Sequence, residues 1–178
     1  MWGEVLEQHL GLVLHPEKTR VVSVDVGFEF LGFHYFRDPK SGARCKEVRG
    51  KSVQRFREAI RKRTPRLRTQ RPVKPPHVTP SRLAKNRRVA ELIGDLNRFV
   101  RGWHWYFKGI RNRYKVPFEG FDRFLRRRVR SAIVGRVGSG WWNQLITNAM
   151  LRDLGLVCPS DLQKLYAQGQ LAAPVRQD

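Results

Sequence analysis

One stripe of apolar residues constrains the fold of this chain most strongly. Between residues 81 and 108, eight apolar side chains follow the i, i+3, i+4 spacing of one face of an α-helix. These residues are Val89, Leu92, Ile93, Leu96, Phe99, Val100, Trp103 and Phe107. Arginine and lysine side chains occupy many of the positions off this stripe. The pattern predicts a long amphipathic helix that begins near Thr79 and packs its apolar face against a core.

Two further segments have the same helical period. Val53, Phe56, Ile60 and Leu67 predict a first helix, with Ser52 as its expected N-cap. A third helix is predicted after Pro117. Its inward residues are Phe121, Phe124, Leu125, Val129, Ala132 and Ile133, and its outward arginines are Arg123, Arg126, Arg127, Arg128 and Arg130. Residues 65–80 hold half of the ten prolines, interleaved with basic residues, which indicates an extended linker.

The positive charge of the chain is concentrated in this helical part. The sequence has 36 lysine and arginine residues against 15 aspartate and glutamate residues, a net charge of +21. Between residues 44 and 136 the count is 29 basic against 6 acidic residues. Because the balancing acids are missing, we expect a polyanionic partner, and nucleic acid rather than an anionic membrane surface.

The N-terminal part has the period of β-strands. Residues 28–36 are predicted as a single aromatic strand, followed by a turn at 38–42 and a return strand at 43–48. In that strand, one face would carry Phe28, Phe30, His34 and Phe36, and the other Leu31, Phe33 and Tyr35. Since both faces of the resulting hairpin are apolar, we expect other parts of the protein or a second copy of the chain to cover them. A homodimer formed through the hairpin is one possibility.

The predicted fold class is α+β: a short N-terminal antiparallel β-hairpin, a basic three-helix bundle and a helical tail. We assign residues 1–50 to the hairpin part, 51–137 to the basic helical domain and 138–178 to the tail. Within the tail, residues 141–156 and 160–166 are predicted as two helices, the second capped by Ser160 and Asp161.

Sequence motifs for catalysis are missing. The five histidines lack the spacing of metal ligands, and the sequence has no P-loop and no GxGxxG or GxSxG motif. A two-metal polymerase site needs clustered carboxylates, but the sequence contains no Asp-Asp pair. We therefore expect no catalysis by this chain alone, and no cofactor. His104 and Trp105 fall off the apolar stripe, where they could stack on bases or on a partner helix, while core packing is the expected role for most of the cluster from Trp103 to Lys108.

Several segments resemble a known family. Residues 10–21, with Lys18 and Thr19, and the FLGF motif at residues 30–33 are similar to the end of the palm in group II intron-type reverse transcriptases. Residues 96–103 (LNRFVRGW), Tyr106 and Phe107, and residues 121–124 (FDRF) resemble the maturase-specific domain of these proteins, also called domain X or the thumb. The resemblance covers about residues 5–135.

The resemblance implies roles at matching positions. Lys18 would lie near the incoming triphosphate of a polymerase. Phe30, Leu31, Gly32 and Phe33 would form the primer grip. The basic helices would bind intron RNA or an RNA/DNA template–primer duplex, with phosphate contacts from Arg98, Arg101, Arg123, Arg126, Arg127 and Arg130.

The family's YADD metal-binding aspartates and its zinc-binding endonuclease module have no counterpart in this sequence. We therefore expect a C-terminal fragment that binds structured RNA, in particular intron RNA, without catalysis. Two alternatives stay open. The chain is part of a split RNA-directed DNA polymerase, with Mg²⁺ supplied when a separate fingers–palm chain completes it, or it is a general basic RNA- or DNA-binding module. Two distant cysteines suit a reducing cytoplasm, and no apolar run is long enough to span a membrane. Together with the resemblance, which implies a bacterial protein associated with RNA or the nucleoid, these features predict a cytoplasmic location.

Overall fold

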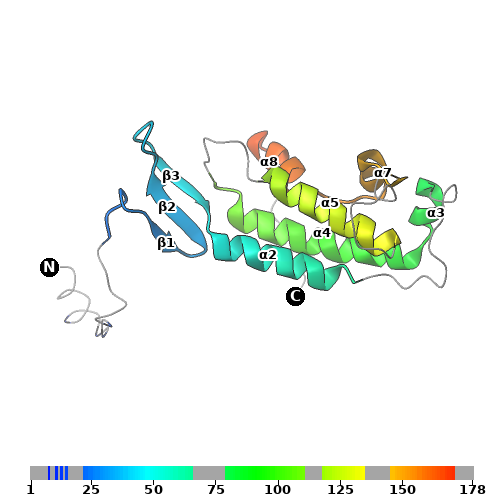
Figure 1. Ribbon diagram of the computed structural model, residues 1–178, viewed down its shortest axis with the longest axis horizontal. Helices are drawn as coiled ribbons and strands as arrows, with labels where there is room; N and C mark the ends of the chain where they lie inside the picture. The colour runs from blue at the N-terminus through cyan, green and yellow to red at the C-terminus, as the bar shows by residue number, and fades with distance from the viewer. Residues whose placement is uncertain are drawn as a thin grey trace.

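The computed structural model describes residues 22–65, 79–110, 118–134 and 145–170, together with residues 8, 11, 13 and 15. In these residues the chain forms a three-stranded sheet followed by six helices, which confirms the predicted α+β class. Figure 1 shows the sheet at one end of an elongated helical body. Lys18, Leu67 and most of the predicted linker lie outside the described residues.

The sheet differs from the predicted hairpin because it has a third strand. Its strands are β1 (Phe28–Phe30), β2 (Phe33–Arg37) and β3 (Arg44–Val48), antiparallel and in the order β1-β2-β3. The chain reverses direction at Leu31 and Gly32, whose φ angles are 47° and 83°. Positive φ at both central residues is typical of the tight turns that join right-twisted hairpin strands. The single strand predicted over residues 28–36 is therefore wrong.

The register of this turn also changes which aromatic side chains share a face. Phe28 is opposite Tyr35, and Phe30 is opposite Phe33. Residues that are directly opposite in an antiparallel pair lie on the same face. All four rings are therefore on one face, whereas the sequence pattern placed Phe33 and Tyr35 on the other. The reason is the turn, which shifts the alternation of the second strand relative to the first.

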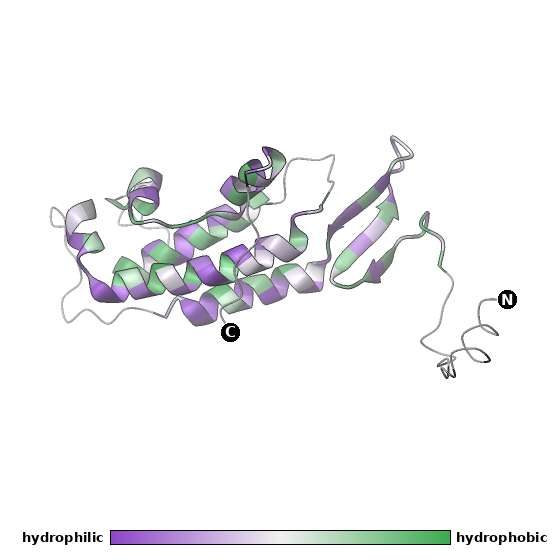
Figure 2. Ribbon diagram, turned by 180° about the vertical axis from the view of Figure 1, so that it is seen from behind, coloured by the Kyte–Doolittle hydropathy of each residue, from purple (hydrophilic) through white to green (hydrophobic). Residues whose placement is uncertain are grey.

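The helical part holds more helices than the predicted three-helix bundle. Its three long helices are α2 (Gly50–Arg63), α4 (Arg87–Phe107) and α5 (Phe118–Val134). The shorter helices are α3 (Pro80–Ala84), α7 (Asn148–Asp153) and α8 (Pro159–Ala167). Figure 2 shows hydrophilic and hydrophobic residues alternating along the long helices, as amphipathic helices require.

The ends of the helices differ from the predicted ends at several places. In the tail, the helix predicted over residues 141–156 is shorter in the described residues, where α7 begins at Asn148, after its N-cap Thr147, and ends at Asp153. The second predicted helix is divided at Asn86, whose side chain caps α4 by accepting hydrogen bonds from the backbone N–H groups of Arg88 and Val89. Ser52 lies inside α2, whose N-cap is Arg49, and its hydroxyl donates a hydrogen bond to the carbonyl oxygen of Gly32 in the turn between β1 and β2. The N-cap of α8 is Cys158, since Ser160 is already inside that helix.

The core lies where the three long helices meet. The ring of Phe56 from α2 lies 4.6 Å from that of Trp103 in α4 and 4.7 Å from that of Phe121 in α5. The same core continues into the C-terminal segment, where Leu156 and Leu162 are buried. No helix among the described residues is both long enough and apolar enough to cross a lipid bilayer.

Candidate nucleic-acid interface

Four arginines surround one aromatic ring in a groove of about 450 Å³ between α2 and α5, which we call the arginine groove. Arg57 and Arg61 come from α2, and Arg123 and Arg127 come from α5. The guanidinium carbons of Arg57, Arg61 and Arg127 lie 5.9, 5.5 and 5.8 Å from the centre of the Phe124 ring. At these distances the ring face attracts each cation and helps to orient its side chain.

The arginine groove is positively charged and open to solvent. All four arginines are exposed, and among the described residues none of them has a carboxylate within ion-pair distance. The acidic partners that are present belong to other arginines, for example Asp95 to Arg63. Because a guanidinium is a planar fork of donors that matches a phosphate, this arrangement fits a polyanionic backbone.

Sequence reasoning found only half of this groove. It named Arg123 and Arg127 as phosphate-binding residues but omitted Arg57 and Arg61. Both of these follow the i, i+4 spacing within α2, so the spacing alone places them on one side of that helix. The missing information was that this side of α2 packs beside α5.

Three other arginines of α5 do not cover an outer face as predicted. Arg126 pairs with the buried Asp122 at 3.3 Å. Arg128 donates hydrogen bonds to the hydroxyl and carbonyl oxygens of Thr64, at 3.0 and 2.9 Å. Arg130 donates to the carbonyl oxygen of Ile146 at 2.6 Å. All three are partly buried and hold neighbouring segments, and the predicted role of Arg126 and Arg130 in phosphate binding stays a prediction.

The two predicted phosphate-binding residues of α4 lie elsewhere. Arg98 and Arg101 are exposed, and neither lines the arginine groove. Arg98 lies 3.8 Å from Asp95, one turn away.

His104, predicted to point away from the core, is fully buried and within 2.9 Å of the Gln163 amide oxygen in α8. Trp105 is partly exposed, with the Lys108 ammonium above its ring.

A polar joint connects α5 to the C-terminal helices. The carboxylate of Asp122 accepts hydrogen bonds from the backbone N–H and the hydroxyl of Ser160. Burial raises the pKa of Asp122, although these hydrogen bonds and Arg126 oppose the shift. Burial, together with the nearby Asp122 charge, also raises the pKa of the Cys158 thiol to about 11. This thiol is therefore protonated and unreactive at neutral pH.

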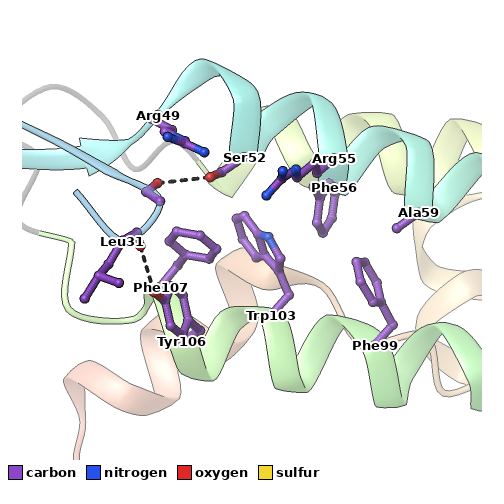
Figure 3. Close-up of a pocket in the computed structure, with 11 residues that line it drawn as sticks. Leu31, Arg49, Ser52, Arg55, Phe56, Ala59, Phe99, Trp103, Tyr106 and Phe107 are labelled. Carbon is purple, nitrogen blue, oxygen red and sulfur yellow. Dashed lines mark hydrogen bonds between the residues drawn. The ribbon is translucent and has the colours of Figure 1, made fainter. Parts of the chain in front are cut away.

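The residues predicted as a primer grip form the turn between β1 and β2, which is fixed to the helices. The carbonyl oxygen of Gly32 accepts hydrogen bonds from the Ser52 hydroxyl and the Arg49 backbone N–H, both at 3.1 Å. The carbonyl oxygen of Leu31 accepts one from the Tyr106 hydroxyl at 2.7 Å. Figure 3 shows both side-chain hydrogen bonds. Gly32 has a φ of 83°, which residues with a side chain rarely adopt, and a Cβ atom there would lie 3.1 Å from the Ser52 oxygen, so this position favours glycine.

This turn separates the four predicted primer-grip residues into two groups. Phe33 is buried, with its ring 5.0 Å from Phe107 and 5.6 Å from Tyr106. Phe30 and Leu31 are 58% and 65% exposed. Phe30 and Leu31 therefore face solvent, whereas Phe33 fixes the sheet to α4 through its contacts with Tyr106 and Phe107. No group of three histidine, cysteine, aspartate or glutamate side chains in the described residues is arranged to hold a metal ion.

One protein-family model matches part of the helical region. Residues 79–144 match the family model of the group II intron, maturase-specific domain. The matched stretch contains α3, α4 and α5, and so includes one wall of the arginine groove. No curated protein matches the chain. Residues 79–144 are therefore a maturase-specific domain region, as in group II intron reverse transcriptase/maturases, and the family predicted from the sequence is confirmed for this stretch.

Proposed function

We propose that this chain binds structured RNA, in particular intron RNA, through the arginine groove, and that it does so without catalysis of its own. The observation that carries the proposal is the set of four exposed arginines around Phe124, with no carboxylate partner among the described residues. The match to a maturase-specific domain supports intron RNA as the class of partner.

The proposed binding is dominated by phosphate contacts. Each phosphate that an arginine neutralises releases condensed counterions, so that the binding constant falls with salt. For four contacts to a duplex, the slope of log K against log salt is about −3.6, which corresponds to a loss of about 100-fold between 50 and 200 mM salt. The Phe124 ring would orient the guanidinium groups before binding and so reduce the entropy lost on complex formation.

The test is a salt titration with two double variants of equal charge. In the first, Arg61→Gln and Arg127→Gln remove one arginine from each wall of the arginine groove. In the second, Arg87→Gln and Arg152→Gln remove two exposed arginines that lie outside it. We expect the groove variant to lose about tenfold in affinity for a folded intron-type RNA and to reduce the salt slope by about 1.8. The control variant should stay within about twofold. Equal losses in the two variants would contradict a localised interface.

A second candidate function is that of a split RNA-directed DNA polymerase. The observation that favours it is the anchored turn at residues 30–33, which presents Phe30 and Leu31 to solvent. Primer extension with Mg²⁺, deoxynucleotides and a separate fingers–palm chain tests this possibility. Extension only in the presence of both chains, and its loss in Gly32→Val, would support it.

A further inference from the structure

A second groove lies on the opposite side of α2, between α2 and α4, and we call it the aromatic groove. Its volume is about 550 Å³, within the range of small-molecule pockets. It is lined by Leu31, Gly32, Arg49, Ser52, Arg55, Phe56, Ala59, Phe99, Trp103, Tyr106 and Phe107. Unlike the arginine groove, it is mainly apolar, and it ends at the turn between β1 and β2.

The aromatic groove has a wall of flat rings on α4, and on α2 it has the Phe56 ring flanked by the small side chains of Ser52 and Ala59. Phe99, Trp103 and Phe107 project from successive turns of α4 toward α2, as Figure 3 shows. Across from them, Ser52 and Ala59 are small and leave room between the helices. The rings of Trp103 and Phe107 are 4.6 Å apart and tilted by 39°, so that they form a continuous apolar surface.

Positive charge lies at the mouth of this groove. Arg55 is exposed, extends across the groove toward Trp103, and has no carboxylate within ion-pair distance among the described residues. Arg49 also lines the groove and pairs with Glu29 at 3.2 Å. A ligand that satisfies both features must combine a flat apolar group with an anion. A nucleotide has this chemistry, since its base stacks on aromatic rings and its phosphate binds arginine.

We infer that the aromatic groove binds one unpaired base of the RNA, with the adjoining phosphate on Arg55. The inference rests on the proposed function, because the arginine groove supplies the RNA. The two grooves share α2, and a helix with its side chains is only about 10–12 Å across. A backbone that passes over α2 therefore reaches both grooves. A base in a continuous duplex is already paired and stacked, so the groove selects a bulge, a loop or a single-stranded end.

The test compares two RNA hairpins that differ in one nucleotide. One carries a bulged 2-aminopurine, and the other carries the same fluorescent base paired within the stem. Both have a fluorescent label at the far end, so that affinity is measured by anisotropy and stacking by quenching of 2-aminopurine. We expect the full chain to bind the bulged hairpin about tenfold more tightly than the paired one and to quench its base.

The decisive variant is Ala59→Leu, which fills the aromatic groove without removing a core side chain. We expect it to reduce the preference for the bulge to less than about twofold while affinity for the paired hairpin is unchanged. Ala90→Leu is the matched control, because Ala90 is exposed on α4 outside the groove and should leave the preference intact. Arg55→Gln, an exposed position, is the second variant if Ala59→Leu does not fold, and it should also weaken only the bulged complex.

The possible failures are distinguishable. If neither hairpin binds, the proposed function fails. If both bind equally with strong salt dependence, or if the bulge preference survives in folded Ala59→Leu, only the present inference is overturned. If the chain is a dimer that Ala59→Leu converts to a monomer, the groove is a contact between two copies, which also overturns it.

Discussion

The two sides of α5 use arginine in opposite ways. On the side toward α2, Arg123 and Arg127 are exposed and line a groove with no acidic lining residue. On the side toward the C-terminal helices, Arg126 and Arg130 are partly buried and bonded to Asp122 and to the carbonyl oxygen of Ile146. All four lie within eight positions of one helix.

The difference between these two sides shows that a count of arginines does not measure an interface. A charged group that leaves water must recover its lost hydration from a partner, and Arg126 does so through a carboxylate. An arginine without such a partner stays exposed and is available to an external anion. We therefore expect the side toward α2 to determine RNA affinity and the side toward the C-terminal helices to determine stability.

The largest predicted effect is on stability, from Asp122→Ala. This carboxylate is 3% exposed and is bonded to both Ser160 and Arg126. Its removal leaves a partly buried arginine and a backbone N–H without their acceptor, so we expect a loss of about 3 kcal/mol in the free energy of unfolding. Urea denaturation of the variant and the wild type measures this loss in the free energy of unfolding. Glu119→Ala, at an exposed acid of the same helix, should change stability by less than about 0.5 kcal/mol. A similar small change for both would show that the polar joint contributes little.

A pair of single variants tests the comparison directly. Arg130→Gln should lower the free energy of unfolding by about 2 kcal/mol, because it removes charge-assisted hydrogen bonds to Ile146 and Asn148. Its RNA affinity, measured on the folded protein, should change by less than about twofold. Arg127→Gln should do the reverse, with unchanged stability and an affinity that falls by about three- to fivefold. If both variants weaken RNA binding equally, the side of α5 toward the C-terminal helices belongs to the interface.

Much of the helical architecture was predictable because apolar spacing is a local signal. The stripe from Val89 to Phe107 identified α4, and the inward residues of the third predicted helix from Phe121 to Ile133 lie in α5. The interruption at Asn86 was not predicted, because Thr79 and Pro80 match the residues typical of a helix N-terminus and so favour one helix from there to the stripe that begins at Val89. The turn at Leu31 and Gly32 was hidden by the aromatic residues on both sides, which favour a continuous strand.

The candidate sites could be predicted only in part, because they depend on which helices pack side by side, and a single sequence does not show this. Arg57 and Arg61 become half of a groove only because α2 lies beside α5. His104 was predicted to be free because it lies off the apolar stripe of α4. However, α8 covers that second side of the helix and buries it. In each case the residue type was informative, but its partner came from a segment distant in the sequence.

The smallest predicted effect concerns pH and the contact between α4 and α8. Burial lowers the pKa of His104 below its usual 6.5, and the nearby Lys108 charge acts in the same direction, although the hydrogen bond to Gln163 opposes them. The unfolded chain therefore takes up a proton near pH 6.5 that the folded chain does not. Stability is constant above this pH and falls as pH decreases from 6.5 toward the folded pKa, by at most about 1.4 kcal/mol per pH unit.

We expect His104→Gln to remove this dependence, because glutamine does not titrate and still offers a hydrogen-bond donor to Gln163. The measurement is the difference in the free energy of unfolding between the variant and the wild type at pH 7.5 and pH 5.5, in which the contributions of all other groups cancel. At pH 5.5 the variant should be more stable relative to the wild type than it is at pH 7.5. If it is the same at both values, His104 binds its proton equally well in the folded and unfolded chains, and the buried contact with α8 must open readily enough to admit water.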